Sequence, residues 1–369
     1  MSGIVVLAAG GTGGHIFPAE ALAGELIGRG LKVALVTDRR GQAFGGKLPG
    51  VALHRIRAGR PGAGLISKFA AACEMALGML AARRILRALA PIAAIGFGGY
   101  PSVPTMLAAS RLGLPTVIHE QNARIGRANR WLAPRMRRIA TSFAQLDGLD
   151  IVGHARIVET GNPVRAAVLA ERGVAYAPPR DGVIDLLVIG GSQGAHVLSA
   201  VVPQALALLP PALRARLKVA QQARPEDLDA VRRAYDESGI RAETATFFAD
   251  VPARLAAAHL VISRAGASSV AELCAIGRPA ILVPYRHAAD DHQTANAEAL
   301  AAIGAAWVMS EQNFTATALA QRLEKLFGAP ELLDAAARSA HRHGRPDAAR
   351  RLADLLLETA AKPAAGDPA

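Results

Sequence analysis

Two glycine-rich segments have the composition of loops that hold phosphate groups. The first, Gly10-Gly11-Thr12-Gly13-Gly14, follows an apolar run and leads into His15. Glycines let backbone N–H groups approach an oxyanion, and a helix that starts after the loop adds a favourable dipole. A tight turn would need only two glycines, so we expect a phosphate near this loop. A second loop, Gly190-Gly191-Ser192-Gln193-Gly194, stands in the same position after another apolar run.

Two histidines at the ends of apolar runs are candidates for acid–base chemistry. His15 follows the first glycine loop, and His119 begins the polar run 119–122 (His-Glu-Gln-Asn). Four consecutive polar residues suit neither a core nor a chance surface position. Imidazole titrates near neutral pH, so either histidine could take a proton from a hydroxyl group. A structural role is the alternative for each histidine.

The segment 263–272 has the features of an anion site at the start of a helix. Its small residues expose backbone N–H groups, and Ser268 and Ser269 add two hydroxyl groups. Arg264, just before the loop, strengthens the expectation of an anion. Helix capping by Ser268 and a solvated first-turn position for Glu272 are the alternatives.

Three further motifs bear on sugar and metal binding. The run 290–296 (Asp-Asp-His-Gln-Thr-Ala-Asn) offers amide and hydroxyl groups to a polyhydroxylated ligand, unless Asp291 or Thr294 caps a helix. Asp227-Leu228-Asp229 matches the metal-binding Asp-x-Asp motif, but its place at the start of a polar helical stretch favours capping. The segment 41–47 has the spacing of a P-loop without the Ser or Thr that would hold magnesium. We therefore predict no metal site and no obligatory cofactor.

The elements that position these motifs alternate between strands and helices, as in a parallel sheet covered by helices. Helices are expected near 65–89 and 102–112. Apolar runs predict strands at 4–8, 33–37, 93–96, 116–119, 138–142, 184–189, 217–221, 246–248, 260–263 and 280–284. The scheme restarts after a Pro-rich stretch near 178–179, which predicts two doubly wound α/β domains with a ligand cleft between them.

The expected domain limits follow the Pro- and Gly-rich boundary. Residues 1–165 form the first domain and residues 166–345 the second. Residues 346–361 are expected to form a helix that packs back on the first domain, and 362–369 a disordered tail.

The positive charge of the chain lies in its first half. The formal net charge is +12, and the printed sequence places +13 in residues 1–165 and −1 in residues 166–369. This distribution argues against a uniformly basic nucleic-acid-binding protein and for one half that meets an anionic partner. Two distant cysteines exclude a disulfide framework, and no uninterrupted run of 18 apolar residues predicts a membrane-spanning helix.

Taken together, the motifs resemble those of the MurG family of N-acetylglucosaminyltransferases. The resemblance is carried, in chain order, by segments 10–18, 98–100, 119–122, 161–165, 190–195, 263–272 and 290–297. It implies a GT-B fold and inverting transfer of N-acetylglucosamine from UDP-N-acetylglucosamine to the 4-hydroxyl of the muramic acid in lipid I. The product, lipid II, serves peptidoglycan synthesis, and hence cell shape and cell division.

The resemblance also implies roles for individual residues. Glu272 would hold the ribose hydroxyls, and the backbone of Phe248 would meet the uracil. The other expected donor-binding residues are Thr12, Gly13, Gly14, Asn122, Arg165, Ser192, Arg264, Ser268, Ser269, His292, Gln293 and Asn296. The acceptor pyrophosphate would lie against Gly11, Gly13, Gly14, Gly98, Gly99 and Tyr100. His15 is the first candidate for the catalytic base, with Glu120 and His119 as alternatives.

The lipid acceptor implies a protein bound to the cytoplasmic face of the bacterial inner membrane. Leu65, Ile66, Lys68 and Phe69 begin an apolar stretch flanked by arginines, which suits an interfacial patch on anionic phospholipid. An ordinary core helix is the alternative. Other cell-wall synthesis proteins are candidate partners, and nucleic acid is not. A nucleotide-sugar 2-epimerase and a non-catalytic nucleotide-sugar-binding protein are the competing functions.

Overall fold

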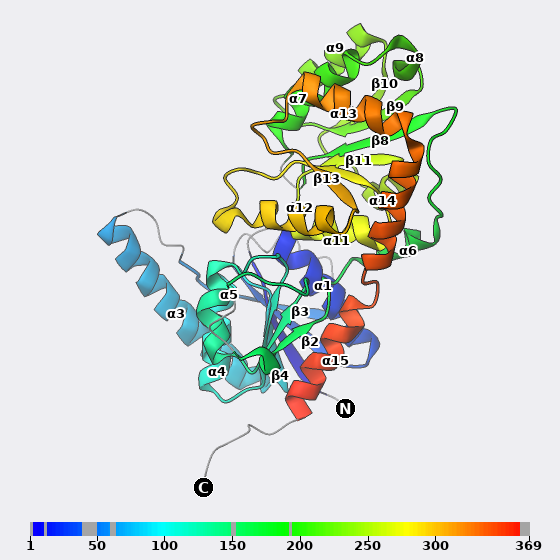
Figure 1. The fold of residues 1–369 in the computed structure, drawn as a ribbon. Helices are drawn as coiled ribbons and strands as arrows, with labels where there is room; N and C mark the ends of the chain where they lie inside the picture. The colour runs from blue at the N-terminus through cyan, green and yellow to red at the C-terminus, as the bar shows by residue number, and fades with distance from the viewer. Residues whose placement is uncertain are drawn as a thin grey trace. The chain divides into compact units, whose positions relative to one another are not determined.

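The computed structural model of the chain describes residues 3–10, 13–38, 50–59, 64–148, 153–191 and 194–361. By its internal contacts the chain divides into two compact units. One comprises residues 1–165 and 345–369, and the other comprises residues 166–344. Each unit contains a parallel sheet with helices on both faces (Figure 1), which confirms the predicted class of two doubly wound α/β domains.

The first unit is built on a sheet with the strand order β3-β2-β1-β4-β5-β6-β7, in which neighbouring strands are parallel. Its strands are β1 (Ile4–Ala8), β2 (Lys32–Thr37), β3 (Val51–Arg55), β4 (Ala93–Gly96), β5 (Thr116–Glu120), β6 (Arg138–Thr141) and β7 (Ile157–Glu159). The order reverses between β1 and β4, and ligands of such sheets bind beyond the carboxyl ends of the strands at this reversal.

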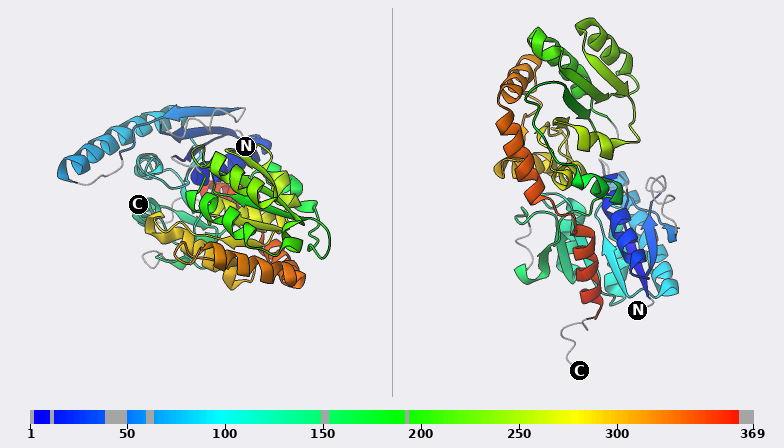
Figure 2. Two further views of the ribbon diagram at one scale, coloured as in Figure 1. Left: turned by 90° about the horizontal axis from the view of Figure 1, so that it is seen from above. Right: turned by 90° about the vertical axis from the view of Figure 1, so that its right-hand side faces the viewer.

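Helices of the first unit cover both faces of this sheet. On one face lie α1 (Gly13–Gly28) and α15 (Ala348–Ala361), which contact each other although they come from opposite ends of the chain (Figure 2). On the other face lie α3 (Leu65–Leu89), α4 (Ser102–Arg111) and α5 (Arg127–Leu132). Successive side chains of a strand point to opposite faces. Val5 therefore packs in the core beneath α1 and α15, and Val6 in the core beneath α3 and α4.

The second unit has the strand order β10-β9-β8-β11-β12-β13, again with parallel neighbours. Its strands are β8 (Ile184–Ile189), β9 (Leu217–Gln222), β10 (Arg241–Ala245), β11 (Leu260–Ser263), β12 (Ala280–Leu282) and β13 (Ala306–Val308). Its order reverses between β8 and β11, so the second glycine loop and the 263–272 motif both follow strands at the reversal.

Helices also cover both faces of the second sheet. One core joins the sheet to α7 (His196–Ala207), α9 (Leu228–Ser238) and α13 (Ala316–Gly328). The other face carries α10 (Val251–Ala257), α11 (Ala267–Ile276) and α12 (His292–Ala302), and α14 (Pro330–His343) contacts both α11 and α13. Gly277 ends α11 because its φ of 78° gives the left-handed cap that a residue with a side chain rarely adopts.

One predicted strand is wrong. The apolar side chains at 246–248 suggested a strand, but β10 ends at Ala245 and the chain turns at Thr246. The strand itself is the polar sequence Arg-Ala-Glu-Thr-Ala at the edge of the sheet, where its side chains are largely exposed. Phe248 is buried although it lies outside the strand. The guanidinium group of Arg254 lies over its ring, with 4.1 Å between the guanidinium carbon and the ring centroid.

Candidate active site

His15 lies in the first turn of α1, next to the turn that follows β4. In this turn Gly98 and Gly99 have φ values of 82° and 73°, which residues with side chains rarely adopt. A Cβ atom on Gly98 would lie 3.4 Å from His15 Cε1, and one on Gly99 would lie 3.4 Å from His15 Cδ2. The two glycines therefore let the backbone lie directly against the imidazole ring, so that two distant motifs meet at His15.

His119 is fully buried at the end of β5. Its Nε2 lies 3.0 Å from the carbonyl oxygen of Gly161, and its ring packs 5.6 Å from that of Phe97, centroid to centroid. Burial is the main cause that lowers the pKa of His119 from 6.5 to about 4, although the hydrogen bond to the Gly161 carbonyl opposes the shift. His119 is therefore neutral at physiological pH.

Glu120 is also buried, with 2% of its surface exposed. Its Oε1 accepts hydrogen bonds of 3.0 Å from the backbone and the side-chain nitrogen of Asn122. Its Oε2 accepts from Gly126 N at 3.1 Å and from Asn129 Nδ2 at 2.8 Å. Four donors thus occupy the carboxylate, which ties together the turn between β5 and α5.

The three candidate bases therefore differ in their access to a ligand. His119 and Glu120 are buried and hydrogen-bonded within the protein, whereas His15 is partly exposed. A base must reach the proton that it abstracts, so this environment favours His15.

Arg165 lies beside the same helix. Its guanidinium carbon is 4.7 Å from the ring centroid of Phe17, which is in α1 two residues after His15. Tyr100, at the end of the glycine turn, is partly exposed. A cation and an aromatic hydroxyl thus belong to the same unit as His15 and the glycine turn.

In the second unit, the start of α11 presents two serines and a carboxylate. Ser268 and Ser269 lie in the first turn, and Glu272 follows one turn later with 7% of its surface exposed. The Ser268 hydroxyl oxygen is buried and has no hydrogen-bond partner among the described residues. Buried hydroxyl groups almost always have a partner. A ligand oxygen at this helix N-terminus would supply one.

One residue of the 290–296 motif contacts the loop that leads into α11. Asn296 is fully buried, and its Nδ2 donates to the carbonyl oxygen of Ala265, just before α11. The Oε1 of Gln293 accepts from the backbone N–H of Tyr285 at 3.0 Å. His292 begins α12 and is partly exposed. Asn296 thus holds the loop that leads into α11.

Arg264 has an acidic partner within the second unit. Its Nη2 lies 2.5 Å from Oε1 of Glu311, and its Nη1 donates to the carbonyl oxygen of Val283 at 3.1 Å. Its guanidinium carbon is also 5.3 Å from the ring centroid of Tyr285. Because Glu311 balances its charge, Arg264 is held at the end of β11 before any anion binds.

The Asp227 and Asp229 carboxylates of the Asp-x-Asp motif each lie beside a basic side chain. The Oδ1 of Asp227 is 2.8 Å from Nδ1 of His196, and Asp229 is exposed beside Arg232. Asp227 occupies the N-cap position of α9, but its side chain makes no capping hydrogen bond, so that part of the prediction is wrong. In the described part of the chain no three His, Cys, Asp or Glu residues are grouped so that they could hold a metal ion.

Comparison with known proteins identifies the family. The model of the glycosyltransferase family 28 N-terminal domain matches residues 5–141, and that of the C-terminal domain matches residues 185–352. A Paramagnetospirillum magneticum protein named UDP-N-acetylglucosamine--N-acetylmuramyl-(pentapeptide) pyrophosphoryl-undecaprenol N-acetylglucosamine transferase is 58% identical, with 96% of each chain covered. The crystal structure of Acinetobacter baumannii MurG superposes with a TM-score of 0.80 at 30% identity, covering 96% of this chain and 99% of that one. The chain belongs to the MurG family of glycosyltransferases.

The GT-B fold of the MurG family is shared more widely. UDP-N-acetylglucosamine 2-epimerase from Neisseria meningitidis superposes with a TM-score of 0.68 at 12% identity, covering 97% of this chain and all of that one. At such low identity the likeness concerns the fold alone.

Some residues and segments named in the sequence predictions lie outside the described residues. They are Gly11, Thr12 and Ser192, together with the 41–47 loop and the 362–369 tail. In the predicted membrane patch, the side chains of Leu65, Ile66 and Lys68 also lie outside the described part of the structure.

Helix α3, which contains that patch, is buried on one side and exposed on the other. Ala82 and Leu86 pack in the core, so the alternative of a core helix holds for that side. On the other side Phe69 is 74%, Leu77 49% and Leu80 55% exposed. The helix extends beyond the sheet of its own unit (Figures 1 and 2). Among the described helices, none is long and apolar enough to cross a membrane.

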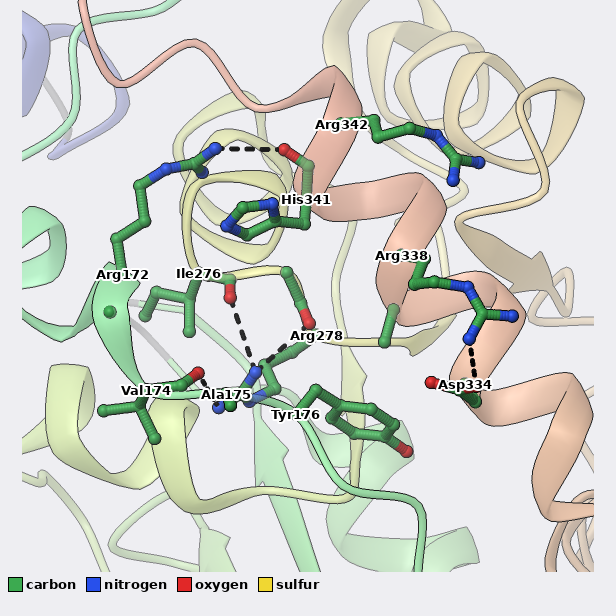
Figure 3. Close-up of a pocket in the computed structure, with 13 residues that line it drawn as sticks. Arg172, Val174, Ala175, Tyr176, Ile276, Arg278, Asp334, Arg338, His341 and Arg342 are labelled. Carbon is green, nitrogen blue, oxygen red and sulfur yellow. Dashed lines mark hydrogen bonds and ion pairs between the residues drawn. The ribbon is translucent and has the colours of Figure 1, made fainter.

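A pocket of about 490 Å³ in the second unit lies apart from the MurG motifs (Figure 3). Four arginines line it, of which Arg338 pairs with Asp334, and two others are bound to carbonyl groups at helix C-termini. Arg278 donates to the carbonyls of Ala256 and Gly277, and Arg172 donates to those of Ala275 and His341. Cations at helix C-termini are stabilised by the helix dipole, which gives these arginines a structural role.

Sequence reasoning assigned no role to three residues that bond candidate site residues within their own unit. Gln121 bonds both histidines, Asn129 bonds Glu120, and Glu311 pairs with Arg264. Gln121 stands within the polar run at 119–122, which was a usable signal. Asn129 and Glu311 lie in segments without a motif, and only the folded chain brings them to their partners.

Proposed function

We propose that this chain transfers N-acetylglucosamine from UDP-N-acetylglucosamine to the 4-hydroxyl of N-acetylmuramic acid in undecaprenyl-pyrophosphoryl-N-acetylmuramoyl-pentapeptide. The product would be lipid II, the disaccharide lipid used to build peptidoglycan. The names of relatives that match almost the whole chain, and the presence of both family 28 domains, support this activity.

The observation that carries the mechanism is the environment of His15. Its imidazole is partly exposed in the first turn of α1, against the Gly98–Gly99 turn. We assign His15 as the base that removes the proton of the acceptor hydroxyl. The O–H bond breaks as the oxygen attacks the anomeric carbon, and the proton moves to His15. The bond between the sugar and UDP breaks with its electron pair on the diphosphate, which inverts the anomeric centre.

The donor would bind at the start of α11. The N-terminal amides of this ten-residue helix and the hydroxyl groups of Ser268 and Ser269 would stabilise the charge that gathers on the leaving UDP. Glu272, one turn later, would accept hydrogen bonds from the ribose hydroxyls. With UDP placed there, Arg165 would contact the diphosphate. His292 and Gln293 would contact the donor sugar. Because α11 would supply this stabilisation, we expect the reaction to require no metal ion.

The acceptor lipid requires contact with a membrane. The exposed face of α3 carries Phe69, Leu77 and Leu80 toward one end and the exposed Arg83, Arg84 and Arg87 toward the other. Apolar side chains inserted at the interface and arginines facing anionic headgroups together favour peripheral binding. We propose that α3 holds the enzyme on the anionic cytoplasmic surface of the bacterial inner membrane.

Incubation of the full chain with UDP-N-acetylglucosamine and a soluble lipid I analogue tests the activity. We expect a disaccharide product, and we expect His15→Ala to lower turnover by about 10²–10⁴-fold. Formation of the free 2-epimer would identify an epimerase, and UDP binding without any product would identify a binding protein. Near-normal turnover of His15→Ala would transfer the role of base to another group.

A further inference from the structure

A chain of hydrogen bonds links His15 to the backbone of Gly161 through two side chains that carry no formal charge. At the far end, Nε2 of His119 lies 3.0 Å from the carbonyl oxygen of Gly161. A carbonyl oxygen only accepts, so Nε2 must carry a hydrogen. His119 is fully buried and neutral, and its one ring proton is therefore on Nε2. Its Nδ1 must then act as an acceptor.

The orientation of the Gln121 amide follows from this tautomer. Its Nε2 lies 3.0 Å from His119 Nδ1 and 3.0 Å from the His119 carbonyl oxygen. Both atoms are acceptors, so the amide nitrogen must face them. A flipped amide would place its oxygen against two acceptors inside a buried site. The Oε1 atom of Gln121 consequently points toward His15.

The orientation of Gln121 in turn determines the tautomer of His15. His15 Nδ1 lies 3.2 Å from Gln121 Oε1. The amide oxygen only accepts, so Nδ1 carries the hydrogen, and the lone pair of the neutral ring is on Nε2. The two carbons bonded to Nε2 are the atoms nearest to Gly98 and Gly99. The basic nitrogen thus belongs to the ring edge beside the glycine turn.

We propose that Gln121 is a positioning residue that holds His15 in the Nδ1–H tautomer, in which Nε2 can accept the proton of the acceptor hydroxyl. This role rests on the proposed function of His15 as base. Gln121 would not touch the reacting atoms itself. It acts from a fixed position because His119 and the Gly161 carbonyl determine which end of its amide faces His15.

An amide differs from a carboxylate in this position. Both accept a hydrogen bond from Nδ1–H, but the amide brings no negative charge that would favour a protonated imidazole. The buried His119 could not easily hold a second proton to balance such a charge. Gln121 can therefore orient His15 without adding a charge that would favour the protonated ring, and a base must be unprotonated before the reaction.

Nitrogen NMR of the full chain labelled with ¹⁵N-histidine tests the tautomer directly. The chain has ten histidines, and the spectrum of His15→Gln assigns the signals of His15 by their absence. When the His15 ring of the wild-type protein is in its neutral form, we expect its Nδ1 to be protonated and its Nε2 to be unprotonated. The opposite pattern, or an equal mixture of the two tautomers, would overturn the proposal.

Two variants separate positioning from general disruption. Gln121→Met removes the acceptor at similar volume, so we expect mixed tautomers at His15 and a turnover lowered about tenfold to a hundredfold with the KM for UDP-N-acetylglucosamine unchanged. Gln121→Glu retains an acceptor for Nδ1–H but adds a negative charge, so Nδ1 of His15 should stay protonated while the doubly protonated ring becomes more favourable. A Gln121→Met protein whose His15 signals match the wild type would refute the proposal. The NMR result does not depend on turnover, so it stays distinct from a failure of the proposed reaction.

Discussion

Arg264 and Glu311 form an ion pair across two loops of the second unit, with a distance of 2.5 Å between Nη2 and Oε1. Only 11% and 13% of the two side chains are exposed, so water screens the pair poorly. Arg264 comes directly before the loop that leads into α11, where we propose that the UDP diphosphate binds. The pair therefore holds a cation next to an anion site while keeping its charge balanced in the unliganded protein.

Glu311→Gln should lower the free energy of unfolding of the full chain by about 3 kcal/mol, because it leaves an unpaired and nearly buried guanidinium. Urea denaturation measures this change. Asp229→Asn is a matched control in the same unit, since its pair with Arg232 has a distance of 3.8 Å and side chains that are 53% and 83% exposed. The control should lose less than about 1 kcal/mol. Equal losses in the two variants would show that the pair of Arg264 and Glu311 stabilises the fold no more than an exposed pair does.

The buried His119 should make the first unit sensitive to acid. Burial lowers its pKa in the folded protein from 6.5 to about 4. Between these pH values the unfolded chain binds a proton that the folded chain does not, so stability falls as the pH falls. The contribution of His119, fully present above pH 6.5, should reach about 3 kcal/mol.

Urea denaturation of the wild type and of His119→Gln at pH 7 and pH 4.5 measures this contribution. The wild type should lose more stability on acidification than the variant, since glutamine does not titrate. If the variant folds poorly, an NMR titration of the His119 ring signals in the wild type measures the pKa of His119 directly. An ordinary pKa near 6.5 for those signals would contradict the prediction.

Glu272→Gln should weaken the binding of UDP about tenfold to a hundredfold, because a carboxylate accepts hydrogen bonds from hydroxyl groups more strongly than an amide does. Isothermal titration calorimetry with UDP measures the change. Glu298→Gln, at an exposed position on α12, removes the same charge and should leave the affinity unchanged. An unaltered affinity in Glu272→Gln would remove Glu272 from the proposed donor site.

The double variant Phe69→Ser and Leu80→Ser should bind vesicles that contain anionic phospholipid at least about tenfold more weakly than the wild type, because two exposed apolar side chains are lost. Co-sedimentation measures binding. Leu208→Ser, which replaces a leucine 58% exposed in the other unit, should bind as the wild type does. Raising the salt concentration should weaken all binding that depends on the arginines of α3. Equal vesicle binding by the double variant and the wild type would exclude α3 as the contact surface.

Treatment with EDTA should leave the turnover of a soluble lipid I analogue essentially intact, since the proposed stabilisation of the leaving UDP comes from α11 and its serines. The residual activity of the metal-free enzyme, compared with the same enzyme after adding back Mg²⁺, measures the effect. Complete loss of turnover that Mg²⁺ restores would show that a metal ion takes part.

The sequence determined the alternation of strands and helices and the places where the chain must turn. Apolar runs identified most of the central strands, and α3 and α4 lie within a residue or so of their predicted limits. Gly98 and Gly99 adopt the left-handed conformations that their residue type permits. These properties depend on neighbours along the chain, and local patterns therefore predict them. The strand predicted at 246–248 failed because the edge strand β10 is too polar to give an apolar signal.

Which polar side chains are accessible, and which titratable groups are neutral, depends on tertiary packing. The sequence left His119 open as an alternative to His15 for the base, but the sheet buries His119 against Gly161 and leaves His15 partly exposed. Gln121 meets His15 across a separation of 106 residues, and Arg264 meets Glu311 from another loop. The pKa of a histidine, its tautomer and the balance of a buried charge all depend on burial and on hydrogen-bond partners. Long-range packing supplies both, and no local pattern in the sequence contains them.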